Sequence, residues 1–480
     1  MRNATKSDAY DFTRLLRNAC DDSFRAALDV RTRPNYFGGT HYDYPAVSWY
    51  GKNGMPYIST SNFGSPVDFG SAFTSLGKYD HDDLYSGPSY SRDEVPEYVK
   101  FLEYIESNAR FSEYFSASWT GGRVARFYIS NLISSCIGKH FHDHGDSDYN
   151  GIDDRIIHRC VKTITNSVLQ VSAVVPIALT KFDVAHFKID SGLYIFRMGE
   201  RTHLRRAKAE NHGSGASMSV VNAATHALVS QLWTVKNDRY EDIAGILNGQ
   251  NAPPYELIDR FFAAMRLVTG YETGYGQALY IPRGWQAEYL ASLPKAYGTT
   301  IRKYPARFDN FGWNRESLPQ VTKSDLVATR DVYLSLSARQ ENKIGLATKR
   351  LNACMTRDDI DDAIVDATIA LEVLLGDEDP QATTYKLRMR AGALARLDGG
   401  SPSEAASLQR DITSIYKERS NIVHGNISKK AKSSEIREPS EKRGEVRVLA
   451  SDTLRTLLRI LLKYPKYIEV AAIDRDLLIG

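Results

Sequence analysis

The chain has 480 residues, which is too long for a single hydrophobic core and predicts two or three domains. Its hydrophobic fraction of 42% and charged fraction of 25% are ordinary for a globular protein, and its net charge of +3 points to no particular partner. Four cysteines lie far apart without a Cys-x-x-Cys pair, which argues against a disulfide scaffold or a zinc–thiolate site and suits a reducing cytoplasm.

The beginning of the chain carries no pattern of export. Residues 1–12 are polar and contain both charge signs, unlike a signal peptide. The longest apolar stretch, residues 167–180, is too short to span a bilayer and is interrupted by Gln170 and Pro176. We therefore expect a cytoplasmic protein without a membrane partner.

Residues 1–320 mix two kinds of pattern and predict an α+β region of one or two subdomains. Gly, Pro, Ser and Tyr cluster in residues 43–90, which is typical of loops. β-branched runs predict strands within residues 167–198. Apolar residues recur at helical spacing over three windows, 94–114, 220–235 and 254–268. By elimination, we expect this region to sense a signal, recruit a substrate or inhibit the rest of the chain.

A histidine-rich segment lies inside this region. If the segment is extended, alternate imidazoles share one side and could bind Zn²⁺ or Ni²⁺. The acidic turn that follows matches the first half of a calcium loop, but Ile157 stands where a bidentate Glu is required. We interpret the segment as a polar turn without a metal ion. The alternating histidines are His140, His142 and His144.

Downstream of residue 320 the pattern is almost wholly helical, so residues 321–480 are predicted to form an α-helical bundle. The boundaries of its helices are predicted at 324–356 (one helix or two), 358–375, 385–397, 401–424 and 445–462. Between residues 381 and 465 there are 17 Lys and Arg against 9 Asp and Glu, a local net charge of +8 that leaves about −5 for the rest of the chain. Such a field is expected where phosphate is the target.

The helix predicted over residues 401–424 has strong boundaries. Ser401, Pro402 and Glu404 form a capping-box signature at its start. Gly425 and Asn426 are a typical left-handed stop, so His424 should lie in the last turn with Arg419 just upstream.

Arg419 and His424 are the most informative residues of the chain. A guanidinium that is always charged can stabilise a crowded phosphate, and an imidazole can move a proton near neutral pH. These are the groups that metal-free RNA cleavage needs. Five residues along a helix correspond to about 140° around its axis, so both side chains cannot face one small ligand from a single helix. Two helices that meet across a two-fold axis remove this difficulty, so the spacing predicts a composite site in a homodimer.

Further motifs carry a family resemblance. The run from Ala370 to Leu375, ALEVLL, is followed by YKLR from Tyr385 and then by Tyr416-x2-Arg419-Ser420-x-Ile422-Val423-His424-Gly425. In order and spacing, residues 324–465 resemble the HEPN superfamily of ribonucleases and nucleotide-binding domains, and the Arg-x4-His string is similar to that of the ApeA-like branch. The resemblance implies a metal-independent endoribonuclease, often in antiviral defence or toxin systems, and a dimer with facing Arg/His strings.

The predicted site divides into four roles. Arg419 and His424 are the catalytic pair, and no cofactor is expected. Tyr416, Ser420 and Asn421 are auxiliary, although many active members of the family carry Asn, Asp or His directly after the Arg, where this chain has Ser420. Glu372 is structural and is expected to pair with Arg388 or Arg419. The predicted RNA-binding residues are Lys386, Arg388, Arg390 and Lys417.

Two other functions stay open at this point. The helical region could be a catalytically silent HEPN module that binds RNA or nucleotide. Alternatively, the chain could be a metal-dependent enzyme centred on residues 140–154, with the bundle used for dimerisation. Expected partners are RNA, a second copy of the chain, and a phage-derived trigger or an inhibitory protein.

Overall fold

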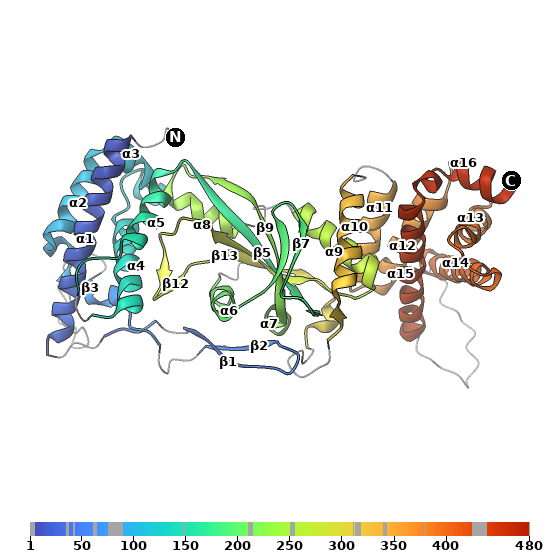
Figure 1. Ribbon diagram of the computed structural model, residues 1–480, viewed down its shortest axis with the longest axis horizontal. Coiled ribbons are helices and arrows are strands. Elements are labelled where there is room, and N and C mark those ends of the chain that lie inside the picture. The colour runs from blue at the N-terminus through green and yellow to red at the C-terminus, as the bar shows by residue number, and fades with distance from the viewer. Residues whose placement is uncertain are drawn as a thin grey trace.

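The computed structural model is an elongated molecule in which a helical layer, a central sheet and a helical bundle follow one another along the long axis (Figure 1). The amino-terminal helices lie at one end and the carboxyl terminus at the other. The structure describes residues 5–34, 38–41, 44–60, 65–74, 90–146, 149–209, 215–249, 255–310, 312, 318–338, 343–379, 381–424 and 439–479.

The first layer consists of five helices that pack around an apolar interior. Every third or fourth residue of the first helix is buried, among them Phe12, Leu16 and Phe24, so an amphipathic stripe directs this helix inward. The helices are α1 (Lys6–Thr32), α2 (Pro96–Ser107), α3 (Ala109–Tyr114), α4 (Arg126–His144) and α5 (Asp154–Thr165).

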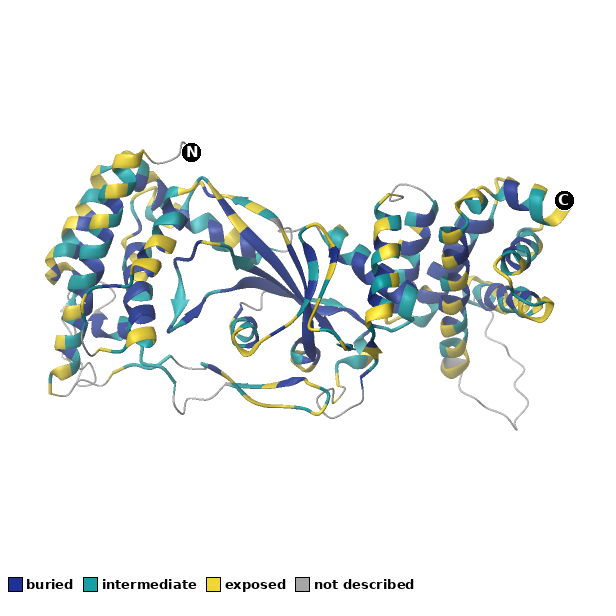
Figure 2. Ribbon diagram, viewed as in Figure 1, coloured by how far each residue is buried: buried dark blue, intermediate teal, exposed yellow. Residues whose placement is uncertain are grey.

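The centre of the molecule is a six-stranded antiparallel sheet with the order β13-β10-β5-β9-β8-β7. Its strands are β5 (Val168–Ala178), β7 (His186–Asp190), β8 (Leu193–Arg197), β9 (Ala224–Lys236), β10 (Tyr275–Pro282) and β13 (Tyr297–Lys303). The two long central strands pair from Val168 opposite Lys236 to Ala178 opposite Ala224. They are buried along most of their length (Figure 2).

Four helices pack around the sheet, and short strand pairs surround it. The helices are α6 (Glu200–Ala207), α7 (Met218–Asn222), α8 (Tyr240–Asn248) and α9 (Tyr255–Thr269). The short strands are β1 (Pro45–Tyr50) with β2 (Pro56–Thr60), β3 (Phe73–Thr74) with β4 (Tyr90–Ser91), β6 (Lys181–Phe182) with β14 (Gln320–Val321), and β11 (Tyr289–Leu290) with β12 (Leu293–Pro294).

The carboxyl-terminal part is helical, and its helices cover one another's apolar faces. They are α10 (Lys323–Ser337), α11 (Lys343–Thr356), α12 (Ile360–Leu375), α13 (Thr383–Leu397), α14 (Pro402–Val423), α15 (Pro439–Lys463) and α16 (Val470–Ile473). The window 324–356 thus contains two helices. The α10 helix packs on α9, and the buried core continues from Phe12 to Ile473.

The mixed α+β class is confirmed, with a multistranded antiparallel sheet and many helices. The division into residues 1–320 and 321–480, and the likeness of the bundle to HEPN domains, stay predictions. No helix among the described residues is long and apolar enough to cross a membrane.

Two predictions about local structure were wrong. Residues 220–235 were expected to be helical, but most of this window is the central strand β9. Residues 223–230 are all buried because neighbouring elements cover both faces of the strand, so the alternating pattern of a half-exposed strand is lost. The expected loop of residues 43–90 includes the hairpin of β1 and β2.

Candidate functional site

The helix α14 is positioned by its start, and this start agrees with the sequence. The N–H of Glu404 donates to Oγ of Ser401 at 3.2 Å, and the N–H of Ser401 donates to Oε2 of Glu404 at 2.6 Å. Pro402 occupies the first turn, where its missing N–H costs nothing. The predicted capping box is therefore confirmed.

The same helix ends at Val423, and His424 is the capping residue. The N–H of His424 donates to the carbonyl of Ser420 at 3.1 Å, which closes the last turn. Gly425 and Asn426, the predicted stop, lie outside the described residues. Leu408, Ile412 and Ile415 are buried against the neighbouring helices and hold α14 in the bundle.

Arg419 lies on α14 beside Glu372 of α12. The distance from Nη2 of Arg419 to Oε1 of Glu372 is 3.9 Å, with 38% and 33% of the respective side chains exposed. The Nε of Arg419 is buried and has no hydrogen-bond partner among the described residues. The guanidinium is thus held loosely by one carboxylate and remains accessible to a ligand. This is one of the two pairings predicted for Glu372.

Tyr416 lies one turn before Arg419 and is buried, with 8% of its surface exposed. Burial is the largest cause that raises the pKa of Tyr416 well above its ordinary value, and the negative charge of Glu372 is the next. The phenol therefore stays protonated at neutral pH and places a polar group next to the Arg419–Glu372 pair.

His424 is exposed at the end of α14. Its side chain makes no hydrogen bond or ion pair within the part of the chain that the structure describes, which resumes at Pro439. The imidazole is therefore exposed where a ligand or a second subunit can reach it. Val423, next to it, has 57% of its surface exposed although it is apolar.

The auxiliary residues point in different directions. The amide of Asn421 donates to Oε2 of Glu418 at 3.2 Å, and Glu418 also lies 3.4 Å from Nε of Arg443 on α15. Asn421 is therefore engaged at the α14–α15 contact in this state. Ser420 is exposed, and its carbonyl accepts the hydrogen bond from His424.

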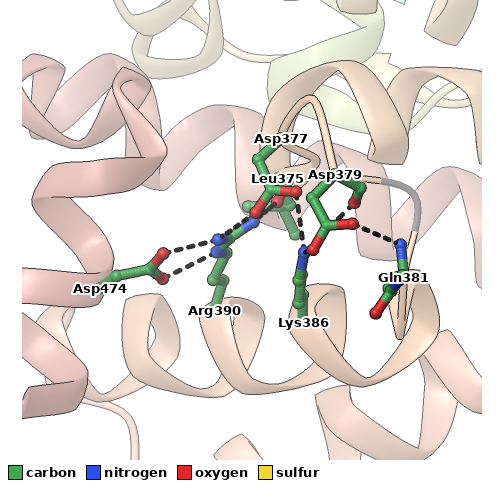
Figure 3. Close-up of polar contacts among 7 residues, drawn as sticks. All are labelled: Leu375, Asp377, Asp379, Gln381, Lys386, Arg390 and Asp474. Atoms are coloured by element: carbon green, nitrogen blue, oxygen red, sulfur yellow. Dashed lines mark hydrogen bonds and ion pairs between the residues drawn. The ribbon is translucent and has the colours of Figure 1, made fainter.

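Of the four predicted RNA-binding residues, Arg390 is placed differently from the prediction. It is buried, and its guanidinium contacts Asp474 at 2.5 Å, Asp377 at 2.7 Å and the carbonyl of Leu375 at 2.7 Å (Figure 3). The expectation that Arg390 lies on the surface is wrong, because two acidic residues from other elements enclose it.

The other three basic residues remain at the surface to different degrees. Lys417 is exposed and Arg388 is half-buried. Lys386 lies 3.0 Å from Asp377 and 2.9 Å from Asp379, so its charge is largely matched (Figure 3). Lys417 and Arg388 are the better candidates for phosphate contacts.

The histidine-rich segment is neither extended nor the polar turn that was predicted, because its three histidines are helical. It forms the last turns of α4, where residues two apart differ by about 200° around the axis. His140 and His144 have ring centroids 4.9 Å apart, whereas Nε2 of His142 donates to the carbonyl of Val67. Among the described residues, no group of three or more His, Cys, Asp or Glu could hold a metal ion. The premise of the predicted three-histidine side was therefore wrong.

A cavity of about 540 Å³ lies between α4, α6, α8 and the β11–β12 hairpin, and no sequence pattern predicted it. Its walls come from several separate segments between His41 and Ala296, so no local motif could reveal it.

Comparison with known proteins finds no match to this chain among family models, curated protein sequences or solved structures. The resemblance to HEPN ribonucleases therefore stays a prediction that rests on the residues themselves.

Proposed function

We propose that the chain is a metal-independent endoribonuclease, acting in antiviral defence or as a toxin, whose site is formed by Arg419 and His424 of two facing subunits. The observation that carries the proposal is the accessibility of both groups at one end of α14. Arg419 is 38% exposed and only loosely paired, and His424 is exposed at the cap.

The chemistry follows from these two side chains. The 2′-hydroxyl of RNA attacks the adjacent phosphorus, the bond to the 5′-oxygen breaks, and the products are a 2′,3′-cyclic phosphate and a 5′-hydroxyl. His424 acts as general base or acid for these proton transfers, which is worth about 10²–10⁴-fold in rate. Arg419 binds the phosphate and stabilises the charge of the transition state. DNA lacks the nucleophile and should not be cleaved.

Two features support a homodimer. Arg419 and His424 are separated by about 140° around α14, so one copy of the helix cannot direct both at the same phosphate. The exposed apolar side chain of Val423 lies next to His424, where a second subunit would cover it. A two-fold axis near the end of α14 would bring the Arg419 of one copy toward the His424 of the other.

A silent module that binds RNA is the second candidate, and one contact favours it. The carboxylate of Glu372 lies beside Arg419, the guanidinium proposed to stabilise the reacting phosphate. A negative charge at that position opposes phosphate binding, which would suit a repressed or inactive site.

The proposal is tested by incubating purified protein with a labelled single-stranded RNA in EDTA. Wild type should cleave the RNA, while Arg419→Ala and His424→Ala should lose cleavage. Arg410→Ala is the matched control for Arg419→Ala, because Arg410 is exposed on the side of α14 opposite to Arg419. His158→Ala is the matched control for His424→Ala, because His158 is exposed on α5. If wild type binds RNA without cleaving it, the silent module replaces the nuclease.

A further inference from the structure

The cavity between α4, α6, α8 and the β11–β12 hairpin lies in the half of the molecule opposite α14 (Figure 1). Its volume of about 540 Å³ falls within the range of about 300–1,000 Å³ that is typical of small-molecule sites. No described residue of its wall belongs to the Arg419–His424 site, so the cavity is a separate feature of the molecule.

One part of the wall is kept open by a glycine. Gly138 is buried in the middle of α4 and lines the cavity. No atom lies within 4 Å of the position that a Cβ would take there. A glycine inside a helix costs about 0.5–1 kcal/mol relative to alanine. The presence of glycine where alanine would fit indicates that the part of the cavity next to Gly138 is occupied by a ligand.

Two cations of the wall are not paired with a carboxylate in the described part of the chain. Arg205 donates from Nε to the carbonyl of Pro294 at 2.9 Å and from Nη2 to the carbonyl of Lys295 at 3.1 Å. Neither Arg205 nor Lys208 forms an ion pair with a carboxylate among the described residues, and Lys208 is exposed. The pKa of Arg205 is lowered to about 10, mainly by burial and next by the positive charge of Arg201.

Two of the three acidic residues of the wall are paired with other cations, whereas Asp68 accepts a backbone hydrogen bond and keeps its negative charge. Lys295 lies 2.7 Å from Glu288, Arg239 lies 2.9 Å from Glu241, and the N–H of Gly70 donates to Asp68 at 2.9 Å. An anion that enters the cavity would therefore meet two cations whose charges are still available.

Another part of the wall is aromatic. Phe127 has 53% of its surface exposed, and its ring lies 6.2 Å from Tyr128, which in turn lies 5.2 Å from Tyr240. These rings offer a face on which a planar group can stack. The hydroxyl of Tyr240 is buried and has no hydrogen-bond partner in the described part of the chain. Such a group costs free energy unless a ligand or water meets it.

We infer that this cavity binds a small anionic ligand that carries a planar ring, of the size and chemistry of a mononucleotide. The phosphate would lie against Arg205 and Lys208, and the ring would stack on the side of Phe127 and Tyr128. Gly138 leaves room for the ligand, and a polar atom of the ligand would meet the hydroxyl of Tyr240.

The test uses the full chain and a panel of ribonucleoside 5′-monophosphates and 5′-triphosphates, measured by calorimetry and by thermal unfolding. At least one nucleotide should bind saturably and raise the melting temperature. The matching nucleoside and inorganic phosphate should each bind at least about tenfold more weakly, because each offers only half of the contacts. A short oligonucleotide that binds more tightly than any mononucleotide would overturn the inference of a small ligand.

Two variants with matched controls locate the site. Gly138→Leu should weaken binding at least about tenfold by filling the cavity, whereas Gly245→Leu should not, because Gly245 is also helical, has open space around it and lies outside the cavity. Lys208→Glu should weaken binding severalfold, whereas Lys188→Glu, at another exposed lysine, should not. The inference is overturned if no nucleotide binds, or if Gly138→Leu and Lys208→Glu, both folded by thermal unfolding, bind as wild type does.

Discussion

Arg419 and Glu372 face each other across the α12–α14 contact, with Nη2 and Oε1 3.9 Å apart. The separation exceeds that of a hydrogen bond, and about a third of each side chain is exposed. A pair of this kind contributes about 0–1 kcal/mol to stability. Glu372 therefore lowers the positive potential at Arg419 without fixing the guanidinium firmly, and a phosphate can displace it.

Glu372→Gln should strengthen RNA binding severalfold while leaving the melting temperature nearly unchanged. The substitution removes the negative charge nearest to Arg419 and keeps the shape of the side chain. The measurement is the dissociation constant for a labelled RNA in the His424→Ala background, where cleavage does not interfere. Glu378→Gln, an equal charge change at an exposed residue, is the control. Unchanged or weaker binding by Glu372→Gln would show that this carboxylate does not compete with phosphate.

Mixing the Arg419→Ala and His424→Ala proteins should restore about a quarter of wild-type cleavage. Random exchange makes half of the dimers mixed, and each mixed dimer has one intact site if the Arg and the His come from different subunits. The measurement is the cleavage rate after subunits have exchanged, beside each variant alone. Complete inactivity of the mixture, with mixed dimers demonstrated, would place both groups of a site on one subunit.

Arg390→Ala should destabilise the bundle by about 3 kcal/mol. The substitution leaves Asp474 and Asp377 without their buried partner, and the partial exposure of both carboxylates puts the loss at the lower end for a buried pair. Hydrogen bonds from Arg390 and then from Lys386 lower the pKa of Asp377 to about 2. Urea unfolding measures the effect, and Lys386→Ala, which removes an outer member of the same cluster, should cost much less.

Lys417→Glu should change RNA binding and not stability, whereas Arg390→Ala should change stability. Lys417 is exposed on α14, so the substitution should weaken RNA binding and reduce its salt dependence while leaving the unfolding midpoint unchanged. Binding titrations at two salt concentrations give both quantities. An unchanged salt dependence would remove Lys417 from the RNA-binding surface.

Stability should fall as the pH drops below about 6.5. Burial lowers the pKa of His203 to about 3 and that of His226 to about 4, so between about pH 6.5 and 4 the unfolded chain binds protons that the folded chain does not. The loss is about 1.4 kcal/mol per pH unit for each histidine. Urea unfolding at pH 7.5 and 5.5 should show it, and His226→Gln should reduce the difference. The same substitution at the exposed His186 should not.

Sequence patterns were most reliable where the cause of the structure is local. The start of α14 depends on Ser401, Pro402 and Glu404, which lie within four residues of one another, and it was predicted correctly. The apolar stripe of α12 was equally clear, because Ala363, Ala367 and Leu371 repeat at helical spacing on a single buried face.

Sequence patterns failed where long-range contacts decide the outcome. Arg390 resembles a surface residue of a basic helix, but Asp474, which encloses it, lies 84 residues away. The first half of the strand β9 is covered on both faces, so its continuous run of buried residues was interpreted as helical. The cavity around Gly138 is assembled from distant segments and leaves no local signal.

Attack by the 2′-hydroxyl, with His424 moving the proton, is best tested by the chemistry of the ends that the protein leaves on RNA. Wild type and His424→Ala are incubated in EDTA with an RNA and with the same RNA carrying a 2′-deoxy nucleotide at the cleaved position. The account predicts 2′,3′-cyclic phosphate ends from wild type alone, and none at the deoxy position. Cleavage by His424→Ala at the wild-type rate, or cleavage at the deoxy position, would contradict it.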